Sequence, residues 1–209
     1  MRKYVLLTCI LVLILIMLAV FIPTLINQNG SEKAGQSFHT AFPAAEVRDL
    51  SITLSGTSLN VRPGETDALL LDTTDLEVET EFNGSRLTVS EKKTFRRSAT
   101  MDIVLPEGFA LNDFSAALGA GNLTATDFSC GSITISCNVG NVWLLLGNTP
   151  DKMDLNVGVG DASVTFPGEQ QIRIQAPYGL GNRDYAERFI VTDDAQYKID
   201  VSVGNTTLR

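Results

Sequence analysis

Residues 119–126 read GAGNLTAT, a glycine corner followed by a short alternating segment, and this unit recurs along the second half of the chain. A Gly followed by Asn or Asp occurs at Gly121-Asn122, Gly140-Asn141, Gly160-Asp161, Gly181-Asn182 and Gly204-Asn205. The spacings are 19, 20, 21 and 23 residues, and a period of this size is typical of stacked repeats. Because both residue types tolerate positive φ, each pair predicts a tight corner in the chain.

Two series of short strands accompany the corners. The first follows a corner directly, at 123–126, 142–145, 162–166 and 206–208, and the second lies between corners, at 132–136, 153–157, 171–175 and 197–201. Apolar residues fall on alternate positions, which is the period of a half-buried strand. Two strand series at one repeat, with no helical pattern, predict an all-β fold: a parallel β-solenoid, similar to a β-helix, in which neighbouring coils bury each other's inward residues.

The region before the repeats is less regular. Residues 76–82 and 85–89 alternate on either side of Asn83-Gly84, a dipeptide that favours a two-residue hairpin turn. Such a turn would pair Phe82 with Ser85 and Thr80 with Leu87. We therefore expect an ectodomain at 46–209 that starts with an irregular β-hairpin part and continues as the solenoid.

These features resemble a known group of bacterial domains. The strand MDIVLP at 101–106 and the corners at 119–122, 158–161 and 179–182 are similar to adhesin-like (autotransporter-adhesin-like) domains of unknown function built from β-strand repeats. The resemblance covers roughly 47–209. It implies a β-solenoid ectodomain in a bacterial envelope protein, and some anchored proteins of this kind resemble components of envelope-stress operons. It carries no catalytic residues, and an adhesin function rests on fold analogy alone.

An apolar segment precedes the repeats. Tyr4–Ile26 contains 23 residues without a charge, and about 20 suffice to span a bilayer as a helix. Arg2 and Lys3 precede it, and the next charge is Glu32, which predicts a cytoplasmic N-terminus. We expect a cytoplasmic tip and one transmembrane helix at 1–26, a polar tether at 27–45, and an ectodomain held outside the cell membrane.

Two other interpretations of this segment remain. A cleaved signal peptide has a shorter apolar region, about 7–15 residues, followed by a small-x-small site that is not clear here. A lipoprotein signal ending at Cys9 would have an unusually short apolar run and a large residue, Thr8, before the cysteine.

Composition excludes several function classes. The chain has 209 residues with 16 Lys+Arg against 24 Asp+Glu, a net charge of −8, which does not suit a nucleic-acid partner. One His and three Cys show no metal-ligand spacing, so we expect no metal and no cofactor. We also expect no enzyme activity, because the acidic pairs, such as Asp193-Asp194, look like turn residues.

Parity along the strands picks out one candidate contact. In the strands that follow a corner, the second and fourth residues after the Asn or Asp should face outward, and only Trp143 and Leu145 are apolar there. Exposed apolar groups often mark a partner contact. In the alternative interpretation, the hairpin part or a loop covers this face.

A second candidate contact is basic. Lys92, Lys93, Arg96 and Arg97 lie within six residues, and could touch anionic wall polymer or lipid headgroups. The alternative is a solvated loop.

Cys130 and Cys137 flank one predicted strand. An extended strand places them too far apart for a disulfide, and Cys137 continues the alternation of Ile133 and Ile135, so we expect a small buried side chain.

Two functional hypotheses follow for a membrane-anchored extracytoplasmic protein. It acts as a structural, interaction or envelope-stress accessory protein with an envelope partner, or it is a surface adhesin or a module that binds wall polymer or carbohydrate.

Overall fold

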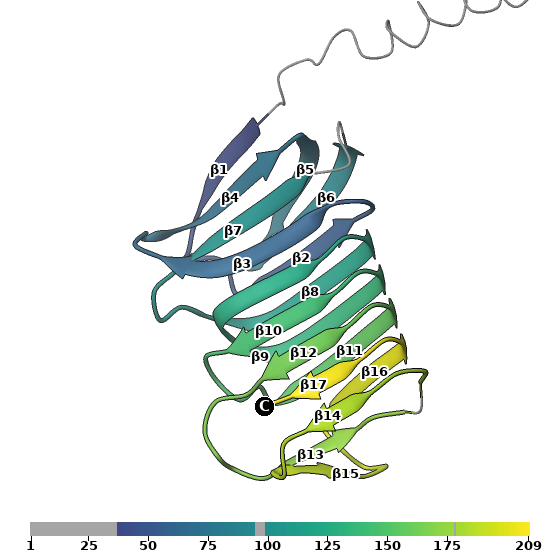
Figure 1. The fold of residues 1–209 in the computed structure, drawn as a ribbon. Coiled ribbons are helices and arrows are strands. Elements are labelled where there is room, and N and C mark those ends of the chain that lie inside the picture. Colours follow the sequence, from purple (N-terminus) through teal and green to yellow (C-terminus); the bar gives the residue numbers. More distant parts are fainter. Residues whose placement is uncertain (1–36, 95–98, 178) are drawn as a thin grey trace, which may run out of the picture. The chain divides into compact units, whose positions relative to one another are not determined.

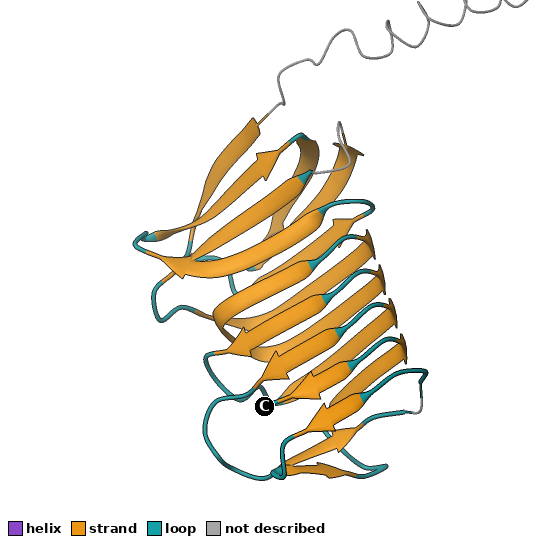
Figure 2. Ribbon diagram, in the orientation of Figure 1, coloured by secondary structure: helices purple, strands orange, loops and turns teal. Residues whose placement is uncertain are grey.

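The computed structural model describes residues 37–94, 99–177 and 179–209 (Figure 1). The expected anchor at 4–26, most of the tether, and Arg96 and Arg97 lie outside these residues. All regular elements of the described part are strands, which confirms the all-β class (Figure 2). None of these residues forms a helix long and apolar enough to cross a membrane.

The described strands divide into an N-terminal part and a run of parallel strands. The N-terminal part contains β1 (Ser37–Pro43), β2 (Asp49–Leu54), β3 (Ser58–Gly64), β4 (Ala68–Thr74), β5 (Leu76–Asn83), β6 (Arg86–Thr94) and β7 (Thr100–Pro106). The parallel run contains β8 (Ala110–Ala120), β9 (Leu123–Val139), β10 (Val142–Leu146), β11 (Lys152–Val159), β12 (Ala162–Thr165), β13 (Ile172–Gln175), β14 (Arg183–Tyr185), β15 (Phe189–Val191), β16 (Tyr197–Val203) and β17 (Thr206–Leu208).

These strands form one open, mixed sheet that bends into two halves. In the half that we call sheet A the order is β1-β4-β7-β3-β9-β10-β12-β17-β14, and in sheet B it is β5-β6-β2-β8-β9-β11-β16-β13-β15. The long strand β9 belongs to both and joins them. The pairs β1–β4, β4–β7 and β5–β6 are antiparallel and the others are parallel.

The stacking order differs from the order along the chain at both ends. Of the last two strands, β16 lies between β11 and β13, and β17 lies between β12 and β14 (Figure 1). At the other end, β2 and β3 lie between the β6/β7 pair and the β8/β9 pair. The repeats share one inward alternation, so the alternation alone does not fix their stacking order.

The corners are as tight as the sequence predicts. The corner glycines have φ from +140° to +146°. A Cβ on Gly160 would lie 1.8 Å from the carbonyl oxygen of Gly140, and one on Gly204 would lie 1.8 Å from that of Gly160. Only glycine fits here, because the backbone of the next strand passes where a side chain would begin.

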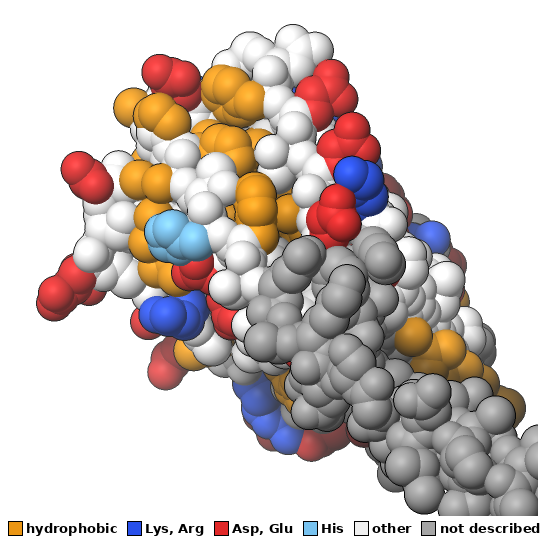
Figure 3. Space-filling view, turned by 90° about the horizontal axis from the view of Figure 1, so that it is seen from above, with side chains coloured by type: hydrophobic (Ala, Val, Ile, Leu, Met, Phe, Trp, Pro, Cys, Tyr) orange, Lys and Arg blue, Asp and Glu red, His pale blue; other side chains and the backbone are white. Residues whose placement is uncertain are grey.

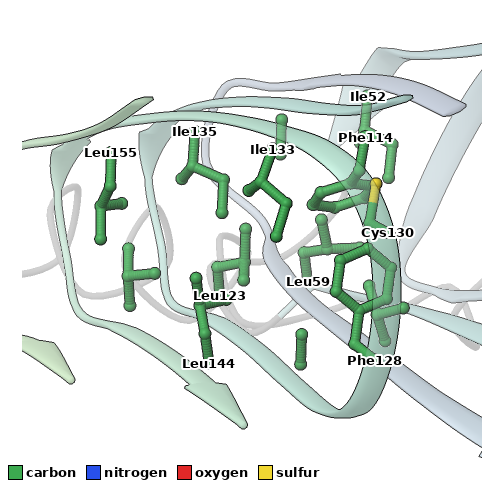
Figure 4. Packing of buried hydrophobic residues seen from close by; sticks show 14 of the residues in the cluster. Ile52, Leu59, Phe114, Leu123, Phe128, Cys130, Ile133, Ile135, Leu144 and Leu155 are labelled. Carbon is green, nitrogen blue, oxygen red and sulfur yellow. The ribbon is translucent and has the colours of Figure 1, made fainter. Parts of the chain in front are cut away.

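The core lies between the two halves of the sheet. Figure 4 shows Ile133, Ile135 and Leu155 pointing from sheet B toward Leu123 and Leu144 of sheet A. All are at most 3% exposed. At one end of this row the rings of Phe114 and Phe128 meet edge to face, 4.9 Å apart. The alternate-residue pattern is therefore confirmed as the source of the core.

The hairpin is confirmed, but its register is not the one predicted. Asn83 pairs with Arg86 and Phe82 with Leu87, so the turn is Gly84-Ser85 instead of Asn83-Gly84. Gly84 has φ +66° and Ser85 does not have positive φ, a combination typical of a type II′ turn with Gly in its first central position. The two-residue shift keeps the same side chains on each face.

Strand β1 begins inside the stretch expected to be a tether. Ser37–Pro43 pairs antiparallel with β4, and Phe38, Thr40 and Phe42 are less exposed than the residues between them. The alternation at 38–42 is therefore that of an edge strand. The tether assignment overlooked it because polar and small residues surround it.

Candidate binding surfaces

A ladder of polar side chains runs along the corners. The Asn141 N–H donates to Asn122 Oδ1 (3.0 Å), and the Asp161 N–H donates to Asn141 Oδ1 (2.8 Å). The ladder continues through Asn205, whose N–H donates to Asp161 Oδ1 (2.7 Å), and ends at Asn182, whose N–H donates to Asn205 Oδ1 (3.1 Å). The five predicted residues therefore share one edge, and each side chain anchors the next corner.

The order within this corner ladder reflects the stacking. Asn205 comes before Asn182, because β16 and β17 are inserted ahead of β14. The first member is one that the sequence did not suggest: the Asn122 N–H donates to Ser58 Oγ (3.3 Å). Ser58 follows Thr57 as Asn follows Gly in the repeats, so a corner without Gly-Asn also belongs to the series.

A column of apolar side chains lies beside the ladder. It consists of the residues just before the corner glycines, which stack in the order Ala120, Val139, Val159, Val203 and Leu180. Val139, Val159 and Val203 are 44–53% exposed, and Leu180 is 74% exposed. The sequence analysis missed this column. Its signal was the apolar residue directly before each of the five corner glycines.

Trp143 and Leu145 lie on the outer face of sheet A. They are 42% and 44% exposed, while Val142, Leu144 and Leu146 face the core. Their neighbours on the adjoining strands are small and polar: Thr124 and Ser163 beside Trp143, and Thr165 beside Leu145. The two apolar side chains thus form an isolated patch on a polar face.

The predicted basic cluster is only partly within the described residues. The Lys92 ammonium lies 2.9 Å from a Glu77 carboxylate oxygen, and both side chains are largely exposed. The hydrogen bond and charge of Glu77 raise the pKa of Lys92. The described part of this cluster is therefore a neutralised surface pair. The side chain of Lys93 and both arginines lie outside the description.

The two described cysteines are buried and free. Burial raises the pKa of the Cys130 thiol to about 12, and it also raises the pKa of the Cys137 thiol. Cys137 faces the core in line with Ile133 and Ile135, as the alternation predicted. Both thiols stay protonated at neutral pH, so neither is an activated nucleophile.

Other polar groups make local contacts. The Glu91 carboxylate accepts from the Ser55 N–H (2.7 Å), the Gly56 N–H (3.3 Å) and the Thr57 hydroxyl (3.1 Å). His39 pairs with Asp72 across β1 and β4, at the end of the molecule seen in Figure 3, where hydrophobic and acidic side chains share the surface. Within the described ranges, no three His, Cys, Asp or Glu side chains lie where they could hold a metal ion together. A shallow polar hollow of about 320 Å³ lies over β2 and β8, beside the Arg86–Asp49 ion pair.

The chain is similar to solved structures. A "putative cell adhesion protein" from Clostridium sporogenes superimposes with a TM-score of 0.64 at 18% identity, over 83% of this chain and 98% of that chain. A "putative adhesin" from Bacteroides fragilis matches with a TM-score of 0.43 at 14% identity, over 83% of this chain and 96% of that chain. At 18% identity, the likeness to the C. sporogenes structure shows the fold alone. No family model and no curated protein matches the sequence.

Proposed function

We propose that the chain is a surface adhesin whose β-strand domain makes contact through an exposed apolar patch. Trp143 and Leu145 carry this proposal, because they are the apolar pair on an otherwise polar outer face. Trp143 is 42% exposed, and water ordered around its ring is entropically unfavourable. A partner that covers the ring releases this water and gains binding free energy, and Trp is enriched at binding hot spots. The pair therefore suits a contact surface better than a free one.

The shared fold supports the same proposal. The C. sporogenes protein, described as a cell adhesion protein, has this fold over nearly all of its length. An accessory role in an envelope-stress system has no comparable support among these neighbours. We therefore favour adhesion over the accessory role.

The rest of the proposal concerns the architecture and location. We propose that the parallel strands act as a β-solenoid, a stiff stem stabilised by the corner ladder, although its coils are not in chain order. The segment at 4–26 anchors the stem in the cell membrane with the N-terminus in the cytoplasm. The domain then works outside the cell as a binding part without enzyme activity, cofactor or nucleic-acid partner.

The test is adherence of cells that display the full chain. Bacteria expressing it are washed under flow over purified cell wall, mucin and bare glass, and compared with cells that carry an empty vector. We expect retention on at least one coated surface. Trp143→Ala combined with Leu145→Ala should reduce it at least several-fold at equal surface expression.

The matched control is Phe82→Ala. Phe82 is 40% exposed, an exposed fraction similar to the 42% of Trp143, but it lies in the hairpin of β5 and β6. Its replacement should leave adherence unchanged. Adherence on none of the surfaces would reject the adhesin proposal, and equal losses in Phe82→Ala and the double variant would reject the patch.

A further inference from the structure

Sheet B opens near the end of the stack. Strands β13 and β16 pair at only two positions, Ile174 with Tyr197 and Gln175 with Lys198. Just before these positions, each segment bonds to its other neighbour in the sheet. The Ile172 N–H donates to the Arg188 carbonyl (3.0 Å), next to β15, and the Gln196 carbonyl accepts from the Met153 N–H of β11 (3.2 Å). The two chain segments therefore separate, and a gap forms between neighbours in the sheet.

The gap is a hollow of about 580 Å³. This volume is within the range of about 300–1,000 Å³ that small-ligand sites occupy. Ile172 and Tyr197 also line it, but they are buried, with only 2% and 8% of their surface exposed. Its polar lining comes from loops on both sides of the gap and from β13: Thr149, Gln170, Gln171, Arg173, Asp194 and Gln196.

Hydrogen bonds and ring contacts hold the walls in place. Gln170 Nε2 donates to Thr149 Oγ1 (2.9 Å), and the Tyr197 hydroxyl donates to the Pro150 carbonyl (2.7 Å). The Tyr197 ring meets Phe166 edge to face with centroids 5.5 Å apart. Burial, together with the negative charge of Asp151, raises the pKa of Tyr197, so its hydroxyl remains a donor. The loop at 149–150 is thereby fixed against β16.

The lining has the chemistry of a site for neutral hydroxyl groups. Arg173 and Asp194 contribute one charge of each sign to the lining, so neither sign dominates it. The three glutamines each present a donor and an acceptor, which is the pair of functions that one hydroxyl group needs.

We propose that this hollow binds a neutral carbohydrate of one or two sugar units. The proposal rests on the adhesin function and names the chemical class that such a protein would recognise. Asp194 accepts from ligand hydroxyls, Arg173 donates to them, and the glutamines bridge neighbouring hydroxyls. The Trp143 patch lies on sheet A, so the two surfaces can be tested separately.

The experiment uses the purified full chain in lipid nanodiscs, because glycoside detergents would compete for the site. The probes are maltotriose, cellotriose and chitotriose, with trigalacturonate as an acidic comparison, followed by saturation-transfer NMR and calorimetry. We expect at least one neutral probe to bind with a dissociation constant of about 1 mM or lower. Gln196→Ala removes one ligand hydrogen bond, and Asp194→Asn replaces a charged acceptor with a weaker neutral one, so each should weaken binding about tenfold.

Asn156→Ala is the matched control, since Asn156 is exposed on β11 and does not line the hollow. The proposal is overturned if no neutral probe binds, if only trigalacturonate binds, or if Asn156→Ala weakens binding as much as Asp194→Asn. Adherence lost in the Trp143 and Leu145 double variant but kept in Asp194→Asn would reject the hollow as the adhesive site and leave the adhesin proposal standing. Sugar binding by cells that adhere to none of the surfaces would support the hollow as a sugar site and reject the adhesin proposal.

Discussion

The two ends of the stack are closed in different ways. At the N-terminal end, antiparallel strands cover the parallel pairs: β4 and β1 follow β7 in sheet A, and β5 follows β6 in sheet B. At the C-terminal end, the outermost strands are β14 and β15, and each has only three residues. Short edge strands limit pairing with other chains, which applies at the C-terminal end, whereas the edge strands at the N-terminal end, β1 and β5, have seven and eight residues.

The two ends also share a feature. At each end, a pair of strands that lies nearer the chain terminus in sequence is inserted inside a pair that lies farther from it. β2 and β3 lie inside β6 and β7, and β16 and β17 lie inside β13 and β14. At the C-terminal end this gives the last strands, β16 and β17, a neighbour on each side, which protects them against fraying. At the N-terminal end the first strand, β1, remains at the outer edge of sheet A.

The largest expected effect comes from removing the inserted strands. A chain that ends at Gln196 loses the buried side chains of Tyr197, Ile199, Val201 and Leu208 from the interior of the stack. Each large apolar side chain contributes about 1.5–3 kcal/mol when buried, and a whole domain is stable by about 5–15 kcal/mol. We expect β11 to β15 to lose cooperative folding, measured by urea unfolding and hydrogen exchange.

Deleting β1 (residues 37–43) is the comparison at the other end. This strand is at the outer edge of sheet A and its residues are at least partly exposed. The shortened chain should keep a single cooperative transition at a lower urea concentration. If removal of 197–209 were as mild as removal of 37–43, the insertion of β16 and β17 would be wrong.

The next effect separates the corner glycines from the hairpin glycine. Gly160→Ala places a Cβ 1.8 Å from a backbone oxygen at φ +142°, which requires the backbone of two neighbouring strands to move. We expect a loss of more than about 4 kcal/mol in the free energy of unfolding. Gly84 has φ +66°, and nothing lies within 4 Å of the Cβ that Gly84→Ala would add. This substitution should therefore cost only the backbone strain of positive φ, about 1–2 kcal/mol.

Equilibrium unfolding in urea of both variants makes this comparison. Equal losses would mean that positive φ, and not the close approach of the next strand, makes glycine necessary at the corners.

These contrasts show how far the sequence could lead. The Gly-Asn spacing and the alternation predicted the strands, the corners and the core, because both patterns follow from local backbone geometry and burial. The position of β16 and β17 could not be predicted, since the repeat at 197–208 fits against Asp161 and Asn182 equally well. The hairpin register was missed because Asn83-Gly84 and Gly84-Ser85 both suit a two-residue turn.

The candidate sites follow the same division. Trp143 and Leu145 were found by parity, which is a local property of one strand. The hollow beside β13 was not found, because its walls come from three loops that only the stacking order brings together. The exposed column at Val139 and Leu180 could have been predicted, because an apolar residue stands directly before each corner glycine.

A smaller effect is expected within the corner ladder. Asn141→Ala leaves the Asp161 N–H without its side-chain acceptor, which should cost about 1–2 kcal/mol. Asp161→Asn keeps an acceptor for the N–H of Asn205 and should be near neutral. At the N-terminal end of the ladder the bond from Asn122 to Ser58 is longer, 3.3 Å, so Ser58→Ala should cost less than Asn141→Ala.

Thermal unfolding of the three variants gives the ranking. If Asp161→Asn destabilised the protein as much as Asn141→Ala, the charge of Asp161 would matter more than its role as an acceptor.

The smallest effect concerns the exposed aromatic side chains of the two regions. Trp143 and Phe82 are 42% and 40% exposed, so each keeps much of its surface in water in the folded state. Truncating a fully buried aromatic residue costs about 3–5 kcal/mol, whereas surface substitutions usually fall within about 0.5 kcal/mol. Both Trp143→Ala and Phe82→Ala should therefore lower the free energy of unfolding by about 1 kcal/mol or less in urea titrations. Because their costs in stability are similar, any difference between them in adherence reports on contact and not on folding. A loss of 3 kcal/mol or more for Trp143→Ala alone would instead make Trp143 part of a covered core on sheet A, and the adhesive patch would have to lie elsewhere on the molecule.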